Sequence, residues 1–239
     1  MIDWYIRLIG EEFDLKIISN IFKSKELNIS EREGGHYLYN KNYCNIKNHD
    51  EVFKESENLI NTINGIAKML QNDFKPIKTQ SIMFYDKDGN RNSFVNLSVH
   101  AELRSAVFAT AHVMGKDGKE KRSTEKNFAH SWLEVANKDE HVKRALWFIS
   151  SKDLDWNILY KIFEIIEPDV RKSINQWASK SLIKNFKHTA NSYSVLGDKA
   201  RHGYENTKPP KNPISFEEAK ALIINILTYW LNSKIIQKI

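Results

Sequence analysis

The spacing of apolar residues changes once along this chain of 239 residues, and the change narrows the folds available to it. Up to about residue 120, short apolar runs and alternating polar residues are typical of β-strands, with helices between them. From about Ser123 onward, apolar residues recur only at the spacing of helix faces. The sequence therefore predicts an α+β fold, with a mixed α/β domain containing antiparallel hairpins at residues 1–120 and an all-α helical bundle at residues 123–239.

A strand, a helix and a hairpin are predicted at the start of the first domain. Residues 4–9 are aromatic and β-branched and stop at a glycine, which is typical of a strand. Residues 11–23 carry apolar side chains at helical spacing, with acidic residues in the first turn. The stretch 27–40 is interrupted by Gly34 and Gly35, which indicates a hairpin, and His36 on its returning strand is expected at the surface.

A long helix and a second hairpin are predicted next. Asp50 is expected to cap a helix whose apolar stripe continues to Leu70. A strand at 82–85 then leads through the turn-forming residues 86–90 into a returning strand at 95–103, where apolar and polar residues alternate. Residues 115–122 are polar and without periodicity, so the domain boundary is expected there.

The second domain shows helix starts in succession. The expected starts are Asp139, Asp153, Pro168 and Ser181. The last helix begins at Ser215, which forms a capping box with Glu218. Its apolar stripe runs to the C-terminus through Ala219, Leu222, Ile223, Ile226, Leu227, Trp230 and Leu231. Such stripes indicate a bundle that the terminal helix closes.

Composition narrows the class of protein. Hydrophobic residues make up 41% and charged residues 28%, which excludes a disordered chain. The single Cys44 excludes an internal disulfide framework and a multi-cysteine zinc site. No apolar run reaches the roughly 18 residues of a membrane helix, and the first residues do not resemble a secretion signal. We therefore expect a soluble cytoplasmic protein that is not bound to a membrane.

Positive charge is concentrated in one part of the chain. Between Arg171 and Lys211 there are nine basic and two acidic residues, a net charge of +7, whereas the whole chain carries +6. Such a concentration favours a polyanionic partner through charge neutralisation and counterion release. The alternative is a solvated helix face with no partner.

The densest group of polar side chains, Lys187–Pro213, lies inside this basic stretch. The sequence contains no phosphate-binding Gly-rich loop, nucleophile elbow or histidine pair at metal-binding spacing, so no cofactor and no metal is expected. Pro168 and Asp169 resemble the start of a metal-dependent nuclease motif, but the acid-x-Lys partner is missing. A helix start explains that pair more simply.

Side chains of this segment suit phosphate chemistry. His202 could transfer a proton and Arg201 could stabilise charge on a phosphate, which is sufficient for metal-independent cleavage of RNA by its own 2′-hydroxyl. The residues expected to hold the substrate are Lys187, His188, Asn191 and Lys199. Adjacent helical residues diverge by about 100°. Arg201 and His202 can therefore act together only from an irregular backbone or on a long ligand.

Residues 123–239 resemble the HEPN superfamily of small helical bundles, whose members often dimerise and cut RNA with a polar Arg-to-His motif near a late helix. The segments Ala200-Arg201-His202-Gly203 and Pro209-Pro210-Lys211-Asn212-Pro213 are also similar to those of a group of bacterial proteins. The resemblance implies that His202 is the histidine of the motif. The family's Arg stands roughly five positions earlier, where this chain has Gly197, so Arg201 would have to replace it.

Three functional hypotheses follow. The first is a HEPN-like bacterial RNA-processing or toxin-type protein, for example in phage defence, which cleaves RNA as a homodimer. The second is a non-catalytic regulatory module that binds nucleic acid or a protein through the same segment. In the third, the helical half only dimerises, while His188 and His202 simply hydrogen-bond helix ends and the proline-rich loop.

Overall fold

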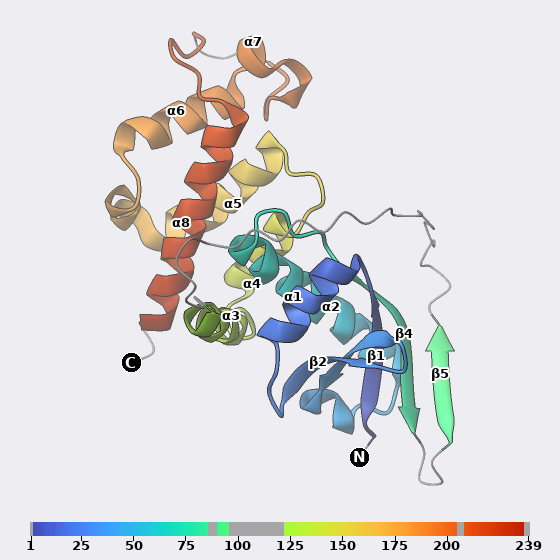
Figure 1. Cartoon of the computed structure of the whole chain (residues 1–239). Helices are drawn as coiled ribbons and strands as arrows, with labels where there is room; N and C mark the ends of the chain where they lie inside the picture. The colour runs from blue at the N-terminus through green and yellow to red at the C-terminus, as the bar shows by residue number, and fades with distance from the viewer. Residues whose placement is uncertain (1, 86–89, 96–121, 205–207, 237–239) are drawn as a thin grey trace, which may run out of the picture. The chain divides into compact units, whose positions relative to one another are not determined.

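The computed structural model describes residues 2–85, 90–95, 122–204 and 208–236 (Figure 1). The chain divides into two compact units, and the α+β class predicted from the sequence is confirmed. The sheet unit comprises residues 1–60 and 77–129, and the helical unit comprises residues 61–76 and 130–239. Most of the boundary expected at 115–122 lies outside the described residues.

The sheet unit is built on a five-stranded antiparallel sheet in the order β2-β3-β1-β4-β5. Burial alternates along the central strand, so Trp4, Ile6 and Leu8 face the core. Apolar residues of α1 and α2 are buried as well, among them Ile18 and Ile60. The elements of the unit are β1 (Trp4–Ile9), α1 (Glu12–Ile21), β2 (Leu27–Arg32), β3 (Gly35–Asn40), η1 (Lys41–Asn45), α2 (His49–Leu70), β4 (Lys78–Tyr85) and β5 (Arg91–Val95).

The first predicted hairpin is present, and the second differs from the prediction because its returning strand begins at Arg91 instead of residue 95. Glu33 and Gly34 connect β2 to β3 with φ of 46° and 71°, the left-handed conformation that a two-residue hairpin turn requires. The second hairpin pairs β4 with β5, which ends at Val95, and the expected continuation to residue 103 lies outside the described residues.

The cap expected at Asp50 is wrong. The helix α2 already begins at His49, and the side chain of Asn48 accepts a hydrogen bond from the Asp50 amide.

His36 is buried, with only 4% of its surface exposed, although the sequence analysis expected it at the surface. The strand register explains the error. His36 lies opposite Leu8, and residues opposite each other in an antiparallel pair project from the same face of the sheet. That face carries the core, so His36 points inward, where its Nδ1 lies 4.0 Å from Oε2 of Glu12.

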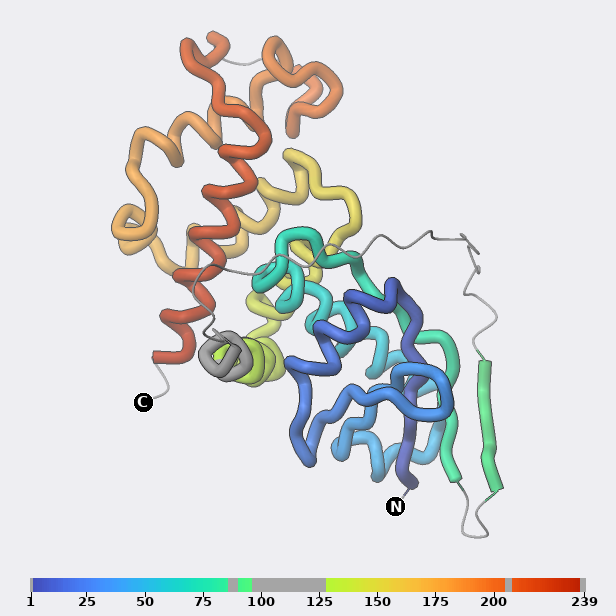
Figure 2. The backbone as a smooth tube through the Cα atoms, in the orientation of Figure 1, coloured from blue at the N-terminus to red at the C-terminus, as the bar shows by residue number. Residues whose placement is uncertain are grey.

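The helical unit contains the part of α2 from residue 61 onward, the part of the next helix from residue 130 onward, and the later helices (Figures 1 and 2). The predicted apolar stripe of α8 is confirmed, because all seven of its residues are buried. Gly65 of α2 packs against the backbone of Leu146 in α4, where a side chain would not fit. The elements are α3 (Arg122–Ala136), α4 (Glu140–Ile149), α5 (Trp156–Val170), η2 (Arg171–Gln176), α6 (Lys180–Asn191), α7 (Tyr193–Leu196), η3 (Gly197–Lys199) and α8 (Phe216–Ile236).

Two of the predicted caps in this unit are confirmed. Asp139 accepts hydrogen bonds from the amides of His141 and Val142, and Ser215 and Glu218 form the capping box through reciprocal hydrogen bonds. Their positions depend only on neighbours within one helical turn.

None of the described helices has the length and apolar character needed to cross a membrane.

Three helix starts differ from the prediction. The cap of α5 is Asp155 rather than Asp153, and the cap of α6 is Ser179 rather than Ser181. Pro168 does not begin a helix but stands in the last turn of α5, where it removes a single backbone hydrogen bond. The helix ends two residues later at Val170, and Arg171 then takes a positive φ of 48°.

Candidate functional site

The polar segment after α6 folds back onto the C-terminal end of that helix. α6 ends at Asn191, and α7 and η3 follow as two short turns. Gly197 allows the chain to reverse because its φ is 56°, a conformation that favours glycine. The amide of Arg201 then donates a hydrogen bond of 2.8 Å to the carbonyl of Ala190. This contact brings His202 next to the end of α6, although the two are separated by ten residues of chain.

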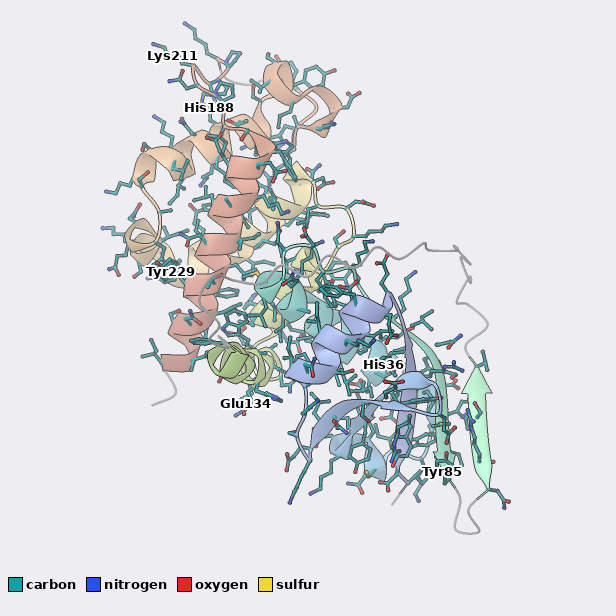
Figure 3. All side chains as sticks on the ribbon, viewed as in Figure 1. His36, Tyr85, Glu134, His188, Lys211 and Tyr229 are labelled. Atoms are coloured by element: carbon teal, nitrogen blue, oxygen red, sulfur yellow. The ribbon has the colours of Figure 1, made fainter. Side chains whose placement is uncertain are left out.

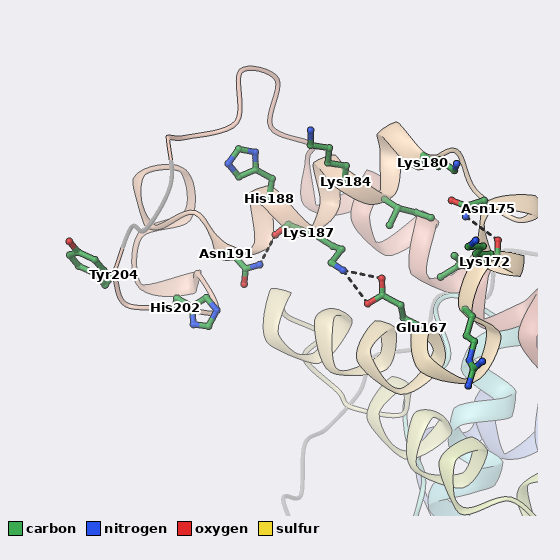
Figure 4. Close-up of a pocket in the computed structure, with 13 residues that line it drawn as sticks. Glu167, Lys172, Asn175, Lys180, Lys184, Lys187, His188, Asn191, His202 and Tyr204 are labelled. Atoms are coloured by element: carbon green, nitrogen blue, oxygen red, sulfur yellow. Dashed lines mark hydrogen bonds and ion pairs between the residues drawn. The ribbon is translucent and has the colours of Figure 1, made fainter.

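A groove of about 790 Å³, here called the His202 groove, lies between η2, α6 and the returning segment (Figure 4). Four of the six predicted site residues line it: Lys187, His188, Asn191 and His202. Arg201 and Lys199 are not among its lining residues. The remaining lining residues are Glu167, Arg171, Lys172, Ile174, Asn175, Lys180, Ile183, Lys184 and Tyr204.

The charges of the His202 groove are strongly unequal. Among the described lining residues, five are Lys or Arg and two are His, whereas Glu167 is the single acid. Both carboxylate oxygens of Glu167 contact Nζ of Lys187, at 2.9 and 3.1 Å, so this ion pair neutralises the acid internally. The groove therefore keeps the positive charge of Arg171, Lys172, Lys180 and Lys184. Such a surface attracts an anion.

Arg201 contacts His202 directly. One guanidinium nitrogen lies 3.1 Å from Nε2 of His202, and because Arg has only donors, Nε2 must accept this hydrogen bond. The other terminal nitrogen donates to Glu164 at 2.7 Å, and the guanidinium lies 4.5 Å from the ring centre of Tyr160. Three partners thus orient Arg201 beside the groove.

Asn191 lies on the floor of the groove, near Lys187 and His202 in Figure 4. Its Nδ2 donates to the carbonyl of Lys187 at 2.8 Å, which fixes the orientation of the amide, since a flipped amide would turn its oxygen toward a carbonyl oxygen. Oδ1 is buried and has no hydrogen-bond partner among the described residues. An unsatisfied buried acceptor costs about 1–3 kcal/mol and marks a place for a donor.

His188 and Lys199 have different surroundings. Nε2 of His188 lies 2.8 Å from the carbonyl of Lys208 and must donate to it, so His188 ties α6 to the proline-rich segment. Figure 3 shows His188 and Lys211 at the same end of the helical unit. Lys199 is exposed on η3. The contact of His188 is the structural one that the sequence analysis offered as the alternative to substrate binding.

The acids of α5 were not predicted as residues of the site. Glu164 and Glu167 bind Arg201 and Lys187, respectively, and neither acid stood out in the sequence. The basic residues Arg171, Lys172 and Lys184 were part of the charge concentration but were not singled out. The excess of basic over acidic residues in this part of the sequence was the pattern that could have identified these three side chains. The acids had no such signal, because their partners lie at least 20 residues further along the chain.

Asp169, the acid of the suspected nuclease motif, belongs to a different cluster in the helical unit. It accepts hydrogen bonds from Nε1 of Trp230 at 2.6 Å and from Lys234 at 2.8 Å, and Lys234 also contacts Asp139 at 2.9 Å. Burial alone would raise the pKa of each acid, but these contacts hold the pKa of Asp139 and of Asp169 below its usual value. Asp169 is thus held by α8. The described residues contain no group of three or more His, Cys, Asp or Glu placed to hold a metal.

Comparisons of the chain with protein-family models, with curated proteins and with solved structures found no match.

Proposed function

We propose that the His202 groove binds the phosphate backbone of RNA. The observation that carries the proposal is the charge of the groove: in the part of the chain that the structure describes, Lys187 neutralises the one acid that lines it, and four further Lys and Arg side chains remain. Basic grooves bind nucleic acid chiefly by displacing counterions from its phosphates. Tyr204 adds an aromatic ring to the groove, and 74% of the surface of Tyr204 is exposed. Exposed aromatic rings in nucleic-acid-binding proteins stack on unpaired bases.

Asn191 favours RNA over DNA as the ligand. Its buried Oδ1 lacks a hydrogen-bond donor among the described residues, and Asn191 is one of the lining residues of the groove. The 2′-hydroxyl of ribose is a donor, whereas deoxyribose has none. A 2′-hydroxyl that reached this oxygen would remove the cost of leaving the oxygen unpaired.

The test of binding is fluorescence anisotropy with a labelled single-stranded RNA at several salt concentrations. Lys184→Ala should weaken binding about threefold to tenfold, because it removes a groove cation. Lys152→Ala is the matched control, since this exposed lysine of the helical unit does not line the groove. Equal losses from the two changes, or no salt-dependent binding by the wild type, would overturn the proposal.

RNA cleavage at His202 is the second candidate function, because His202 lines the groove and contacts the cation of Arg201. In this contact Nε2 already accepts a hydrogen bond from Arg201, so the guanidinium would have to turn toward the phosphate before Nε2 could accept a proton. His202 would take the proton of the 2′-hydroxyl, the 2′-oxygen would attack the adjacent phosphorus, and the bond from phosphorus to the 5′-oxygen would break. Water would supply the proton that the 5′-oxygen takes, and His202 would release its own proton to the solvent. The products are a 2′,3′-cyclic phosphate end and a 5′-hydroxyl end.

Cleavage is tested in EDTA with the wild type, His202→Ala and His202→Gln. Cyclic-phosphate products from the wild type that disappear in both variants are expected if His202 transfers the proton. Binding without product, or equal product in all three proteins, would leave the groove as a binding site only. The HEPN-like fold of the helical unit, its dimerisation and a role in RNA processing or phage defence stay predictions.

A further inference from the structure

A second groove of about 650 Å³ lies between α4 and α5 of the helical unit, and we call it the α4–α5 groove. Its lining residues are His141, Arg144, Phe148, Lys161, Glu164, Ile165, Pro168 and Asp169. The two acids are bound by cations that do not line this groove: Arg201 holds Glu164, and Lys234 holds Asp169. The groove therefore presents Arg144 and Lys161 to an anion without acids that compete for them.

Aromatic rings accompany these two cations. Nζ of Lys161 lies 5.5 Å and Cζ of Arg144 lies 5.7 Å from the ring centre of Phe148. Trp147 does not line the groove itself, but its ring packs edge-on against that of the lining residue Phe148 at 5.0 Å, and 53% of the Trp147 surface is exposed. An exposed aromatic ring beside cations is the arrangement with which proteins hold a stacked base and its phosphate.

Arg201 connects the α4–α5 groove to the His202 groove. Glu164 lines the first groove and His202 lines the second, and Arg201 hydrogen-bonds to both, at 2.7 and 3.1 Å. The guanidinium therefore lies between the two sets of lining residues. A strand that leaves one groove at His202 meets the ion pair of Arg201 and Glu164 before it reaches the other, so Glu164 does not present an unpaired negative charge to its phosphates.

From this geometry we propose that a single strand of RNA bound in the His202 groove continues past Arg201 into the α4–α5 groove. There Arg144 and Lys161 hold a phosphate, and Trp147 beside the groove stacks on a base. The inference rests on the proposed function and names its ligand class, a single strand long enough to fill both grooves. A strand with flexible, unpaired bases can follow the two grooves around α5 and stack on Trp147, whereas the bases of a duplex are already stacked on each other.

The experiment measures the affinity of single-stranded RNAs of increasing length for the wild type and for the double variant Arg144→Ala/Lys161→Ala. Wild-type affinity should rise with length and then level off. The double variant should bind the shortest RNAs like the wild type but bind the longest about tenfold more weakly. Lys143→Ala is the control, because this α4 lysine pairs with Glu140 and does not line the groove.

A second readout does not depend on the stability of that variant. RNAs long enough to reach the α4–α5 groove should quench part of the tryptophan fluorescence, and Trp147→Phe should abolish that part. Quenching or length dependence that survives in the variants would overturn the second groove while leaving RNA binding in the His202 groove intact. If RNAs of every length fail to bind the wild type, both the proposed function and this inference are wrong.

Discussion

Arg201 and His202 are neighbours in the chain, and the guanidinium of Arg201 donates to Nε2 of His202 at 3.1 Å. In a regular helix their side chains would diverge by about 100°. They meet because η3 ends at Lys199 and the chain continues without helical structure. The irregular backbone therefore satisfies the condition that the sequence analysis set for these two residues to act together.

Replacing Arg201 should weaken RNA binding strongly but change the stability of the fold only slightly. Its ion pair with Glu164 is partly exposed, so Arg201→Ala should lower the free energy of unfolding by about 1 kcal/mol or less. The same change should weaken RNA binding about tenfold, because the cation between the grooves is lost and Glu164 is left as an unpaired acid that repels phosphate. Denaturant unfolding and anisotropy measure the two effects. Glu164→Gln, which keeps the cation, is the matched control, and equal loss of RNA affinity in both variants would contradict the prediction.

Asn191 should determine the preference for RNA. The wild type should bind a single-stranded RNA more tightly than a DNA of the same sequence, and Asn191→Ala should reduce that preference because Oδ1 is lost. Competition between the two oligonucleotides for one labelled RNA gives the ratio directly. Asn175→Ala serves as the control, since Asn175 lines the same groove but its amide donates to the carbonyl of Lys172. A ratio unchanged by Asn191→Ala would exclude this role.

The cluster of Asp139, Asp169 and Lys234 should make the stability of the helical unit dependent on pH. Both acids have a pKa below the unfolded value of about 4, so their contribution is present above that pH and is lost as the pH falls through their folded pKa values. Burial by itself would lower the pKa of Lys234, but the two acids raise it, so its contribution holds below about pH 10 and is lost at higher pH.

Lys234→Met is therefore expected to lower the melting temperature at pH 7 by several degrees. The difference from the wild type should shrink as the pH is lowered below 4, because the carboxylates become protonated in both proteins. Thermal unfolding followed by circular dichroism from pH 2 to pH 8 tests this. Lys220→Met, on the same helix but outside the cluster, should not show this narrowing. A constant difference across the range would argue against the ion pairs as its source.

Gly65→Ala should destabilise the helical unit although alanine favours helices. The added methyl group would collide with the backbone of Leu146, which cannot move aside as a side chain can. Forced overpacking of this kind costs typically about 1–3 kcal/mol. Urea unfolding measures the loss, and Gly203→Ala, whose added carbon would meet nothing within 4 Å, is the control. An unchanged midpoint for Gly65→Ala would contradict the close approach of α2 and α4.

The sequence by itself determined the features that depend on neighbours within a turn of helix or along a strand. The capping box at Ser215 and Glu218 and the apolar stripe of α8 are of this kind, and so is the inward face of β1. The α+β class follows from these local patterns. The charge concentration after Arg171 likewise indicated where a basic groove would lie.

Tertiary structure alone decided the rest. Asp153 and Asp155 are equally good caps by residue type, so the sequence around them does not show which of the two begins α5. The burial of His36 follows from its register opposite Leu8, which depends on a strand 28 residues earlier. The acids that bind Lys187 and Arg201 come from α5, at sequence separations of 20 and 37 residues. Local patterns determined the elements and their charge, whereas long-range packing determined which side chains face the groove, because these contacts join residues far apart in the sequence.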